Sequence, residues 1–274
     1  MNFFELDRER CRKDGLCSLE CPGAVIVTDP ETGYPVPRPR GERSCIDCGH
    51  CMAVCPTAAL RVAGRDYGDF PDLDPALEPT REQALQFLKG RRSVRNFKKE
   101  PLPDALVDAI LDATRFAPTA GHKRPVRWII AADPEKIRMI ASLTADWMAD
   151  VPADSPFAAR KSYYRAVAAI ARNGADPILR GAPCLVVAFT ERENNWSRAD
   201  CAIALTYAEL AAHALGVGAC WAGYFTAAAA EYGPLREFLG LEPGNVVGGA
   251  QMLGFPGAPF RRLPRRGPVS ARRL

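Results

Sequence analysis

The sequence predicts an α+β protein with two parts, a small cysteine-rich N-terminal unit and a larger domain of mixed helices and strands. Seven of the ten cysteines lie before residue 56. A stretch rich in proline and aspartate, residues 69–79, follows and is typical of a linker. Beyond it, helical and strand patterns alternate. We therefore expect domains at residues 1–65 and 81–274, joined by a linker at residues 66–80.

The composition is that of an ordinary globular protein. Of the 274 residues, 47% are hydrophobic and 25% are charged, with a formal net charge of +4. So small a positive excess does not predict a nucleic-acid partner. No apolar run approaches the roughly 20 residues that span a bilayer, and the charged N-terminus lacks the apolar core of a secretion signal. We expect a protein of the cytoplasm with no membrane partner.

Local patterns predict the main elements. Residues 26–36 read as two short strands around a turn. The alanine-rich run 202–223 is interrupted by Glu209 and His213, which favours a buried helix over a membrane span. One helix is expected from Asp104, because apolar residues recur at helical spacing: Leu106, Val107, Ile110, Leu111 and Phe116. A second is expected from Pro134 with Asp133 as its cap, and a third over 200–215 with Gly216 as its stop. Strands are expected over 126–130, 184–189 and 246–255.

The second group of cysteines has the spacing C-x2-C-x2-C-x3-C-P, formed by Cys45, Cys48, Cys51 and Cys55–Pro56. This is the spacing of bacterial ferredoxins, in which three close thiolates bind one iron–sulfur cluster and the fourth cysteine reaches the other. A structural zinc site is the alternative. Zinc sites usually contain separated CxxC pairs, so the pattern favours iron–sulfur clusters.

An earlier copy of this pattern lies 34 residues upstream. Cys11, Cys17 and Cys21–Pro22 correspond to Cys45, Cys51 and Cys55–Pro56, while Asp14 stands where the second copy has Cys48. A repeat at constant offset predicts a pseudo-twofold unit with two clusters. The crossover spacing then assigns Cys11, Asp14, Cys17 and Cys55 to one cluster, and Cys21, Cys45, Cys48 and Cys51 to the other.

Asp14 leaves three possibilities open. A carboxylate is a harder ligand than a thiolate and can bind iron through oxygen. The site could hold a four-iron cluster with one replaceable corner, or lose that iron to give a three-iron cluster. Alternatively, Asp14 is a loop residue before Gly15 and binds nothing. Residues 1 to about 65 resemble two-cluster ferredoxins, some of which carry aspartate at this position.

A ferredoxin-like unit needs an electron acceptor, and a flavin can take single electrons and deliver two. The remaining cysteines, Cys184, Cys201 and Cys220, stand alone in apolar surroundings and are expected to act as small core residues. The acceptor site must therefore be sought among other residue types of the larger domain.

Five segments of the larger domain resemble the FMN-dependent nitroreductase family, in the family's order and over residues 85–274. They are Arg91-Arg92-Ser93-Val94-Arg95-Asn96-Phe97, similar to RRSxRxF; residues 117–126, similar to APSxxNxQPW; residues 176–183, which lead into the central strand; residues 216–223, similar to GLGxCWxG; and Gly254-Phe255-Pro256 with Arg265 and Arg266, similar to the closing GYP and its late arginines.

This resemblance implies a nitroreductase-like α+β sandwich and a homodimer with FMN in two sites at the subunit interface. It also implies the contacts. The phosphate, ribityl chain and pyrimidine edge would be held by Arg91, Arg92, Ser93 and Arg95. The other subunit would contribute Pro118, Thr119 and His122. The backbone at Ala222 and Gly223 would face the ring near its reactive nitrogen, and Arg265 or Arg266 would close on the phosphate.

Three positions depart from the family pattern. His122 replaces the usual asparagine, Arg124 the usual glutamine, and Val126 the aromatic residue after proline. A histidine can still donate a hydrogen bond to a flavin oxygen and can carry charge near pH 7. The changes could retune the flavin or its choice of substrate, or they could mark a site that has drifted. A histidine packed without a cofactor role is the alternative.

The resemblance implies transfer of electrons or hydride to a flat, electron-poor acceptor such as a nitroaromatic compound, a quinone or an activated alkene. The clusters suggest a ferredoxin or another low-potential iron–sulfur donor, although the family can bind NAD(P)H without a GxGxxG motif. Trp147, Tyr163 and Tyr164 could stack on substrate or belong to the core. Two rival hypotheses are a non-catalytic electron carrier or redox sensor, and a protein that consumes or stores FMN.

Overall fold

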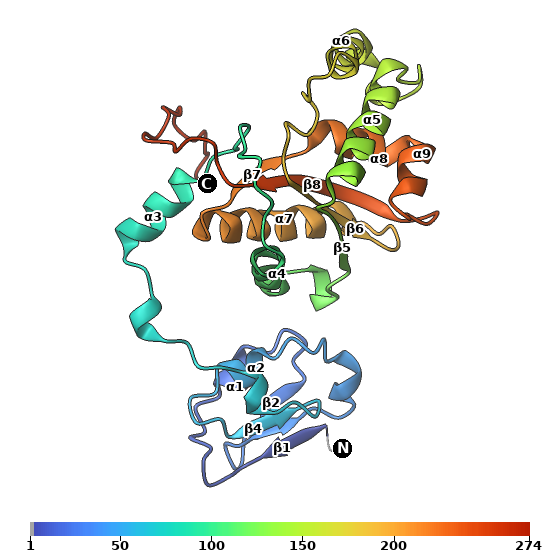
Figure 1. The fold of residues 1–274 in the computed structure, drawn as a ribbon. Coiled ribbons are helices and arrows are strands. Elements are labelled where there is room, and N and C mark those ends of the chain that lie inside the picture. The colour runs from blue at the N-terminus through green and yellow to red at the C-terminus, as the bar shows by residue number, and fades with distance from the viewer. Residues whose placement is uncertain (1–2) are drawn as a thin grey trace. The chain divides into compact units, whose positions relative to one another are not determined.

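The computed structural model describes residues 3–274, which fall into two compact units (Figure 1). Unit 1 comprises Met1–Glu78 with Gly121–Lys123, and unit 2 comprises Pro79–Ala120 with Arg124–Leu274. No helix among residues 3–274 is long and apolar enough to cross a membrane.

Unit 1 is built from two short antiparallel ladders and two one-turn helices. Strand β1 (Phe4–Leu6) pairs with β4 (Leu60–Val62), and β2 (Ile26–Thr28) pairs with β3 (Pro35–Pro37). The predicted pair of strands around a turn is therefore confirmed. Helix α1 (Leu16–Leu19) and helix α2 (His50–Ala53) lie in the two halves of the cysteine repeat. A small core forms around the buried side chains of Cys17, Ile26, Leu60 and Val62.

The sequence repeat is also a backbone repeat. Gly15 and Gly49, which precede the two short helices, have φ values of 72° and 75°. Lys13 and Asp47 form a second left-handed pair, with φ values of 58° and 52°, and Ala24 and Ala58 a third, with 46° and 51°. Left-handed backbone is uncommon outside glycine. Its recurrence at the same offset of 34 residues shows that the two halves fold alike.

Unit 2 contains a four-stranded antiparallel sheet in the order β5-β6-β8-β7. The predicted strands at 126–130, 184–189 and 246–255 appear as β5 (Val126–Ala131), β6 (Cys184–Thr190) and β8 (Val246–Gly254). The edge strand β7 (Gly218–Trp221) was not predicted. The Ala-rich run 202–223 is therefore not one helix, because Gly216 turns the chain at φ 73° and the chain re-enters the sheet.

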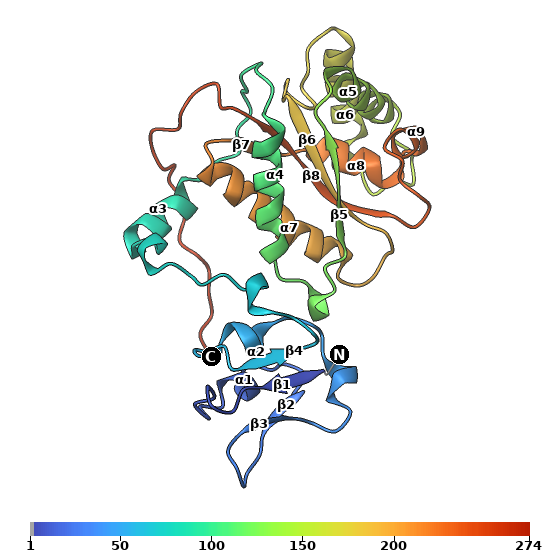
Figure 2. The same cartoon turned by 60° about the horizontal axis from the view of Figure 1, so that its bottom comes forward.

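Helices cover both faces of this sheet, as Figures 1 and 2 show. Side chains of β6 alternate: Cys184 and Val186 join the core on one face, and Leu185 and Val187 join the core on the other. The first face is covered by α4 (Asp104–Ala113) and α7 (Ser197–Ala214), and the second by α5 (Pro134–Ala149), α6 (Lys161–Arg172), α8 (Gly223–Glu231) and α9 (Gly233–Phe238). The expected α+β sandwich is confirmed.

Helix signals in the sequence match the observed ends with two exceptions. The Asp133 side chain accepts from the backbone N–H groups of Glu135 and Lys136, so it caps α5 as predicted. Helix α7 begins at Ser197 rather than at Asp200. Phe116 was placed on the apolar face of α4, but it is 75% exposed, because α4 gives way to a tighter 3₁₀ turn that moves the side chain off that face.

The three isolated cysteines are core residues. Cys184, Cys201 and Cys220 are all 5% exposed or less, and burial raises the pKa of each thiol, for Cys184 to about 12 and for Cys201 to about 11. Helix α3 (Arg81–Gly90) precedes the sheet and begins with a capping box between Thr80 and Gln83. It leads directly into the arginine segment of the predicted flavin site.

Candidate cofactor sites

The second half of the cysteine repeat, together with one residue of the first, lines a cavity in unit 1. Its cysteines are Cys21, Cys45, Cys48 and Cys51. Burial and, to a lesser extent, the negative charges of the other three thiolates together raise the pKa of Cys51 to about 12. Four thiolates this close need a positive partner in order to ionise together, which iron would supply.

A second cavity contains the other predicted set, Cys11, Asp14, Cys17 and Cys55. Burial raises the pKa of Cys17, as do the charges of Cys55 and Asp14. The Asp14 Oδ1 atom accepts a hydrogen bond of 3.2 Å from the backbone N–H of Leu16. Among residues 3–274, no three histidine, cysteine, aspartate or glutamate side chains are grouped as ligands of a single metal ion.

Backbone and hydroxyl groups surround two of the sulfur atoms. The N–H of Val25 donates to Cys21 Sγ at 3.2 Å, and that of Ala59 donates to Cys55 Sγ at 3.3 Å. Burial alone would raise the pKa of Cys55, but hydrogen bonds from Ala59, Thr57 and Tyr67 outweigh it and lower the pKa. Thr57 and Tyr67 were not predicted, because nothing in the cysteine spacing points to them.

In unit 2, the predicted arginine segment runs beside the edge strand β7. Ser93 forms a parallel bridge with Ala219, and the Val94 N–H donates to the Ala219 carbonyl at 2.9 Å. Because β7 ends at Trp221 and leads through Ala222 into helix α8, this pairing places Arg91–Arg95 beside the strand that precedes Ala222 and Gly223. The structure thus brings these two predicted groups together.

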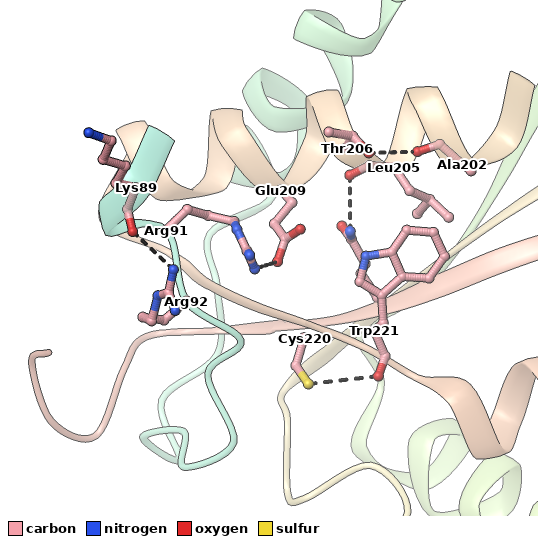
Figure 3. Close-up of polar contacts among 10 residues, drawn as sticks. Lys89, Arg91, Arg92, Ala202, Leu205, Thr206, Glu209, Cys220 and Trp221 are labelled. Atoms are coloured by element: carbon pink, nitrogen blue, oxygen red, sulfur yellow. Dashed lines mark hydrogen bonds and ion pairs between the residues drawn. The ribbon is translucent and has the colours of Figure 1, made fainter. Parts of the chain in front are cut away.

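The first two arginines have different partners (Figure 3). Arg91 Nη1 donates to Oε1 of the buried Glu209 at 2.7 Å, and Arg92 Nη2 donates to the Lys89 carbonyl at 2.9 Å. The Arg92 Nε atom is buried with no hydrogen-bond partner among the described residues. Glu209 was not predicted as a site residue, although a lone acid within an alanine-rich helix is a signal that could have found it.

These arginines line a cavity of about 240 Å³ together with His213 and the turn at 216–219. His213 stacks on Phe87, with 4.9 Å between ring centroids. Burial lowers the pKa of His213, and the positive charge of Arg91 lowers it further. Glu209 also lines the cavity and neutralises Arg91, so Arg92 supplies the net positive charge. This charge and the unpaired, buried Nε–H of Arg92 suit an anionic group.

The N-terminus of α8 is open on one side. Gly223 is exposed, and a Cβ atom placed on it would meet no other atom of residues 3–274 within 4 Å. Beside it, the hydroxyls of Tyr224 and Tyr163 lie 2.5 Å apart. Burial and this hydrogen bond raise the pKa of Tyr224 to about 12. Trp147 and Tyr164 are core residues, 2% and 4% exposed, whereas Tyr163 is 55% exposed.

The other residues predicted to contact FMN lie in the loop before β5 and in the C-terminal stretch. Pro118 and Thr119 precede β5, at the opposite edge of the sheet from β7. Thr119 Oγ1 accepts from the Arg124 N–H at 3.0 Å, and the neighbouring Ala120 N–H donates to the buried Asp200 at 3.1 Å.

Within the same loop, Gly121, His122 and Arg124 have left-handed backbone, with φ values of 58°, 54° and 48°. Such values for histidine and arginine are uncommon and store local strain. The late arginines Arg265 and Arg266 lie in an exposed C-terminal stretch without regular secondary structure, and neither forms an ion pair within residues 3–274.

Comparison with known proteins agrees with this architecture. The nitroreductase family profile matches residues 88–255, and the profile of the 4Fe-4S binding domain matches residues 42–61. The fold and these matches define a redox protein that joins an iron–sulfur binding region to an oxidoreductase domain. The chain belongs to the nitroreductase family, and the prediction of a nitroreductase-family oxidoreductase is confirmed.

Two curated relatives are each named provisionally as an NADH dehydrogenase/NAD(P)H nitroreductase. The protein from Archaeoglobus fulgidus is 29% identical over 175 residues, which are 64% of this chain and 86% of that one. The protein from Methanothermobacter thermautotrophicus is 28% identical over 145 residues, which are 52% of this chain and 61% of that one. The chain thus spans less than two thirds of the Methanothermobacter protein.

Among solved structures, the fold is similar to that of a nitroreductase with bound FMN from Bacteroides fragilis. The TM-score is 0.59 at 23% identity, and the match covers 70% of this chain and 99% of that one. At this identity the likeness concerns the fold.

Proposed function

We propose that this protein is an iron–sulfur flavoenzyme that passes electrons from two clusters to FMN and on to an electron-poor organic acceptor. The observation that carries the proposal is the pairing of Ser93–Val94 with β7, which joins the arginine segment to the open N-terminus of α8. One edge of unit 2 thereby offers a cationic cavity and an uncovered glycine backbone.

The residues at this edge fit FMN, which the similar Bacteroides fragilis structure contains. Arg91, Arg92 and Arg95 would hold the phosphate and polar ring edge, and the buried Arg92 Nε is a donor that such a group would satisfy. Gly223 leaves room for a flat ring at the helix N-terminus, where backbone N–H groups face outward. FMN, when bound, would supply the exchange between one-electron and two-electron transfer.

In unit 1, the two cavities would each hold one four-iron cluster. The first would take Cys11, Cys17 and Cys55 with Asp14 as the fourth ligand. The Leu16 N–H, which donates to Asp14 Oδ1, would hold this carboxylate in place, and as an oxygen ligand Asp14 would make this corner the replaceable one. The second cluster would take Cys21, Cys45, Cys48 and Cys51.

A homodimer would complete the flavin site. In one chain, Arg91 meets α7 at Glu209, whereas Ala120 meets α7 at Asp200. Nine residues of helix separate these two points by roughly 14 Å. If two copies pack α7 antiparallel about a twofold axis, the Asp200 end of one lies near the Glu209 end of the other. Pro118 and Thr119 of one copy would then approach the arginines of its partner.

The outer face of α7 suits that packing. Ile203 and Tyr207 lie one turn apart on it and are 36% and 37% exposed, and Ala199 and Ala214 extend the same face. A Tyr207→Glu substitution should give monomers that retain little FMN. Met139→Glu is the matched control, because Met139 is 48% exposed on α5, which covers the other face of the sheet. Equal sedimentation of the two variants as dimers would contradict this arrangement.

The electron donor we favour is a low-potential iron–sulfur protein, and NAD(P)H is the alternative that the names of the relatives suggest. Nitroaromatic compounds, quinones and activated alkenes are the proposed acceptors, because each is flat and can stack on an exposed ring. The hydroxyl pair of Tyr163 and Tyr224 lies next to Gly223 and can donate a hydrogen bond to an oxygen of such an acceptor.

The test begins with anaerobic purification, followed by assays of iron, labile sulfide and acid-released FMN per chain. The proposal expects one FMN and seven to eight irons, with reduction by a reduced ferredoxin followed by turnover of nitro, quinone or enone acceptors. Bound clusters without FMN would overturn the enzyme and favour an electron carrier. Tightly bound FMN without turnover of any acceptor would favour FMN storage.

A further inference from the structure

In the two halves of unit 1, the crossover cysteines accept equivalent hydrogen bonds from the backbone. Cys21 and Cys55 are equivalent under the repeat, and so are the donors Val25 and Ala59. Each sulfur accepts one backbone N–H, at 3.2 Å for Cys21 and 3.3 Å for Cys55. A hydroxyl group near only one of these two sulfurs would therefore distinguish the two sites.

The side chains differ sharply. The Thr57 hydroxyl lies 3.8 Å from Cys55 Sγ. The Tyr67 hydroxyl donates to the Met52 carbonyl at 3.4 Å and is close enough to Cys55 to help lower the pKa of that thiol. Subtracting the repeat offset of 34 from 57 and 67 gives positions 23 and 33, and both are glycines. The Cys21 half therefore has no hydroxyl at either place.

The glycine at position 23 is required by packing. A Cβ atom on Gly23 would lie 2.7 Å from the Ser44 carbonyl oxygen, a backbone atom that cannot move aside cheaply. A threonine like Thr57 therefore does not fit in the first half of the repeat. The hydroxyl asymmetry is built into the fold of unit 1.

Hydrogen bonds to the sulfur ligands are one of the main determinants of iron–sulfur reduction potential. A donor stabilises the reduced cluster more than the oxidised one, because the reduced cluster carries more negative charge on its sulfurs. We propose that the Thr57 hydroxyl, with the Tyr67 hydroxyl nearby as a secondary contribution, raises the reduction potential of the cluster held by Cys55, so that electrons are drawn toward that half of unit 1. This inference rests on the two clusters of the proposed function.

The transfer concerned is one electron, with no bond made or broken. The cluster of Cys21, Cys45, Cys48 and Cys51 is oxidised by one electron and the cluster that includes Cys55 is reduced by one. The external donor, an iron–sulfur protein or dithionite in the assay, supplies that electron. The hydroxyls of Thr57 and Tyr67 remain neutral throughout and act only on the energy of the reduced state.

The experiment is a redox titration of the full-length protein followed by electron paramagnetic resonance. Tyr67→Phe and Thr57→Val are each expected to lower the midpoint potential of one cluster, and the double variant to lower it further. The potential of the other cluster should stay fixed. Asp14→Cys identifies the cluster concerned, because it alters the spectrum of the Cys55 cluster alone.

Tyr34→Phe is the matched control. Tyr34 lies in unit 1 against Arg8 and Lys13, and no hydrogen bond of the described residues joins its hydroxyl to a cysteine sulfur. It should change neither potential. Unchanged potentials in both Tyr67→Phe and Thr57→Val, or equal shifts of both clusters, would overturn the inference. Thr57→Val alone decides the question if Tyr67→Phe loses iron.

The result is separable from that of the flavoenzyme proposal. A shifted potential in a protein that binds no FMN would support the inference and refute the enzyme. A protein with FMN and turnover but with iron only in the Cys45 half would refute the inference and leave the flavin site standing.

Discussion

Arg91 and Glu209 form a 2.7 Å ion pair in which the carboxylate is 8% exposed and the guanidinium 30%. The pair ties the turn after α3 to the middle of α7, across 118 residues of sequence. It fixes the first arginine of the flavin segment before any ligand is bound. Because removal of one partner leaves a largely buried charge, the pair should matter more than an exposed one.

Glu209→Gln should therefore destabilise unit 2. We expect a loss of about 1–3 kcal/mol in the free energy of unfolding, reduced from the fully buried case because Arg91 is partly exposed. Urea denaturation followed by tryptophan fluorescence measures it. Glu100→Gln is the control, since Glu100 pairs with Lys98 while both are more than half exposed. Equal losses in the two variants would mean that the Arg91 pair contributes no more than a surface contact.

Stability should fall toward acid pH through His213. Its pKa is lowered by burial and by Arg91, so between this value and about 6.5 the unfolded chain binds more protons than the folded one. The contribution is fully present above about pH 6.5 and is lost as the pH falls through the folded pKa. Between pH 8 and pH 5, the free energy of unfolding should fall more steeply with decreasing pH in the wild type than in His213→Gln. Parallel curves would contradict the assignment.

A methyl group at position 223 should separate flavin binding from folding. Gly223→Ala adds a side chain where no atom of the described part of the chain lies within 4 Å, and alanine favours the helix over glycine by about 0.5–1 kcal/mol. Stability should hold or rise while the FMN content per chain falls. Gly233→Ala, at the equally open start of α9, should leave FMN unchanged. Full retention of FMN in Gly223→Ala would show that the ring does not lie against this backbone.

Removal of iron should unfold unit 1 selectively. Among residues 3–78 only seven hydrophobic side chains are buried, and one of them is the predicted iron ligand Cys17, so the clusters would supply much of the stability of unit 1. Anaerobic treatment with a chelator should abolish the hydrogen-exchange protection of β1 and β4 and leave that of β6 and β8 intact. Undiminished protection in β1 and β4 of the iron-free protein would show that this small core suffices.

The sequence anticipated the features that depend on near neighbours. The cysteine spacing and its offset repeat predicted two sets of side chains, and the cavities of unit 1 gather those same sets. The caps at Asp133 and Gly216 likewise act within one turn of the helices they bound. In each case the physical cause lies within a few residues, so a single sequence is enough to read it.

What the sequence did not reveal depends on tertiary contact. The edge strand β7 is four residues long and follows an alanine-rich helix, so its own composition favours no strand. It becomes one because β8 pairs with it along its whole length. Glu209 pairs with Arg91 because the fold places α7 beside the turn after α3, and Tyr67 acts on Cys55 because the chain turns back toward that cysteine.

The interleaving of the two halves of unit 1 has a consequence for biosynthesis. The cavity around Cys11 lacks one wall until Cys55 has been made, and β1 has no partner until Leu60–Val62 have followed it. A ribosome must therefore release the whole repeat from its exit tunnel before either end of unit 1 can close. Cluster insertion would then come late, after translation of this unit is complete, and a nascent chain arrested at residue 50 would hold its cysteines open to oxidation.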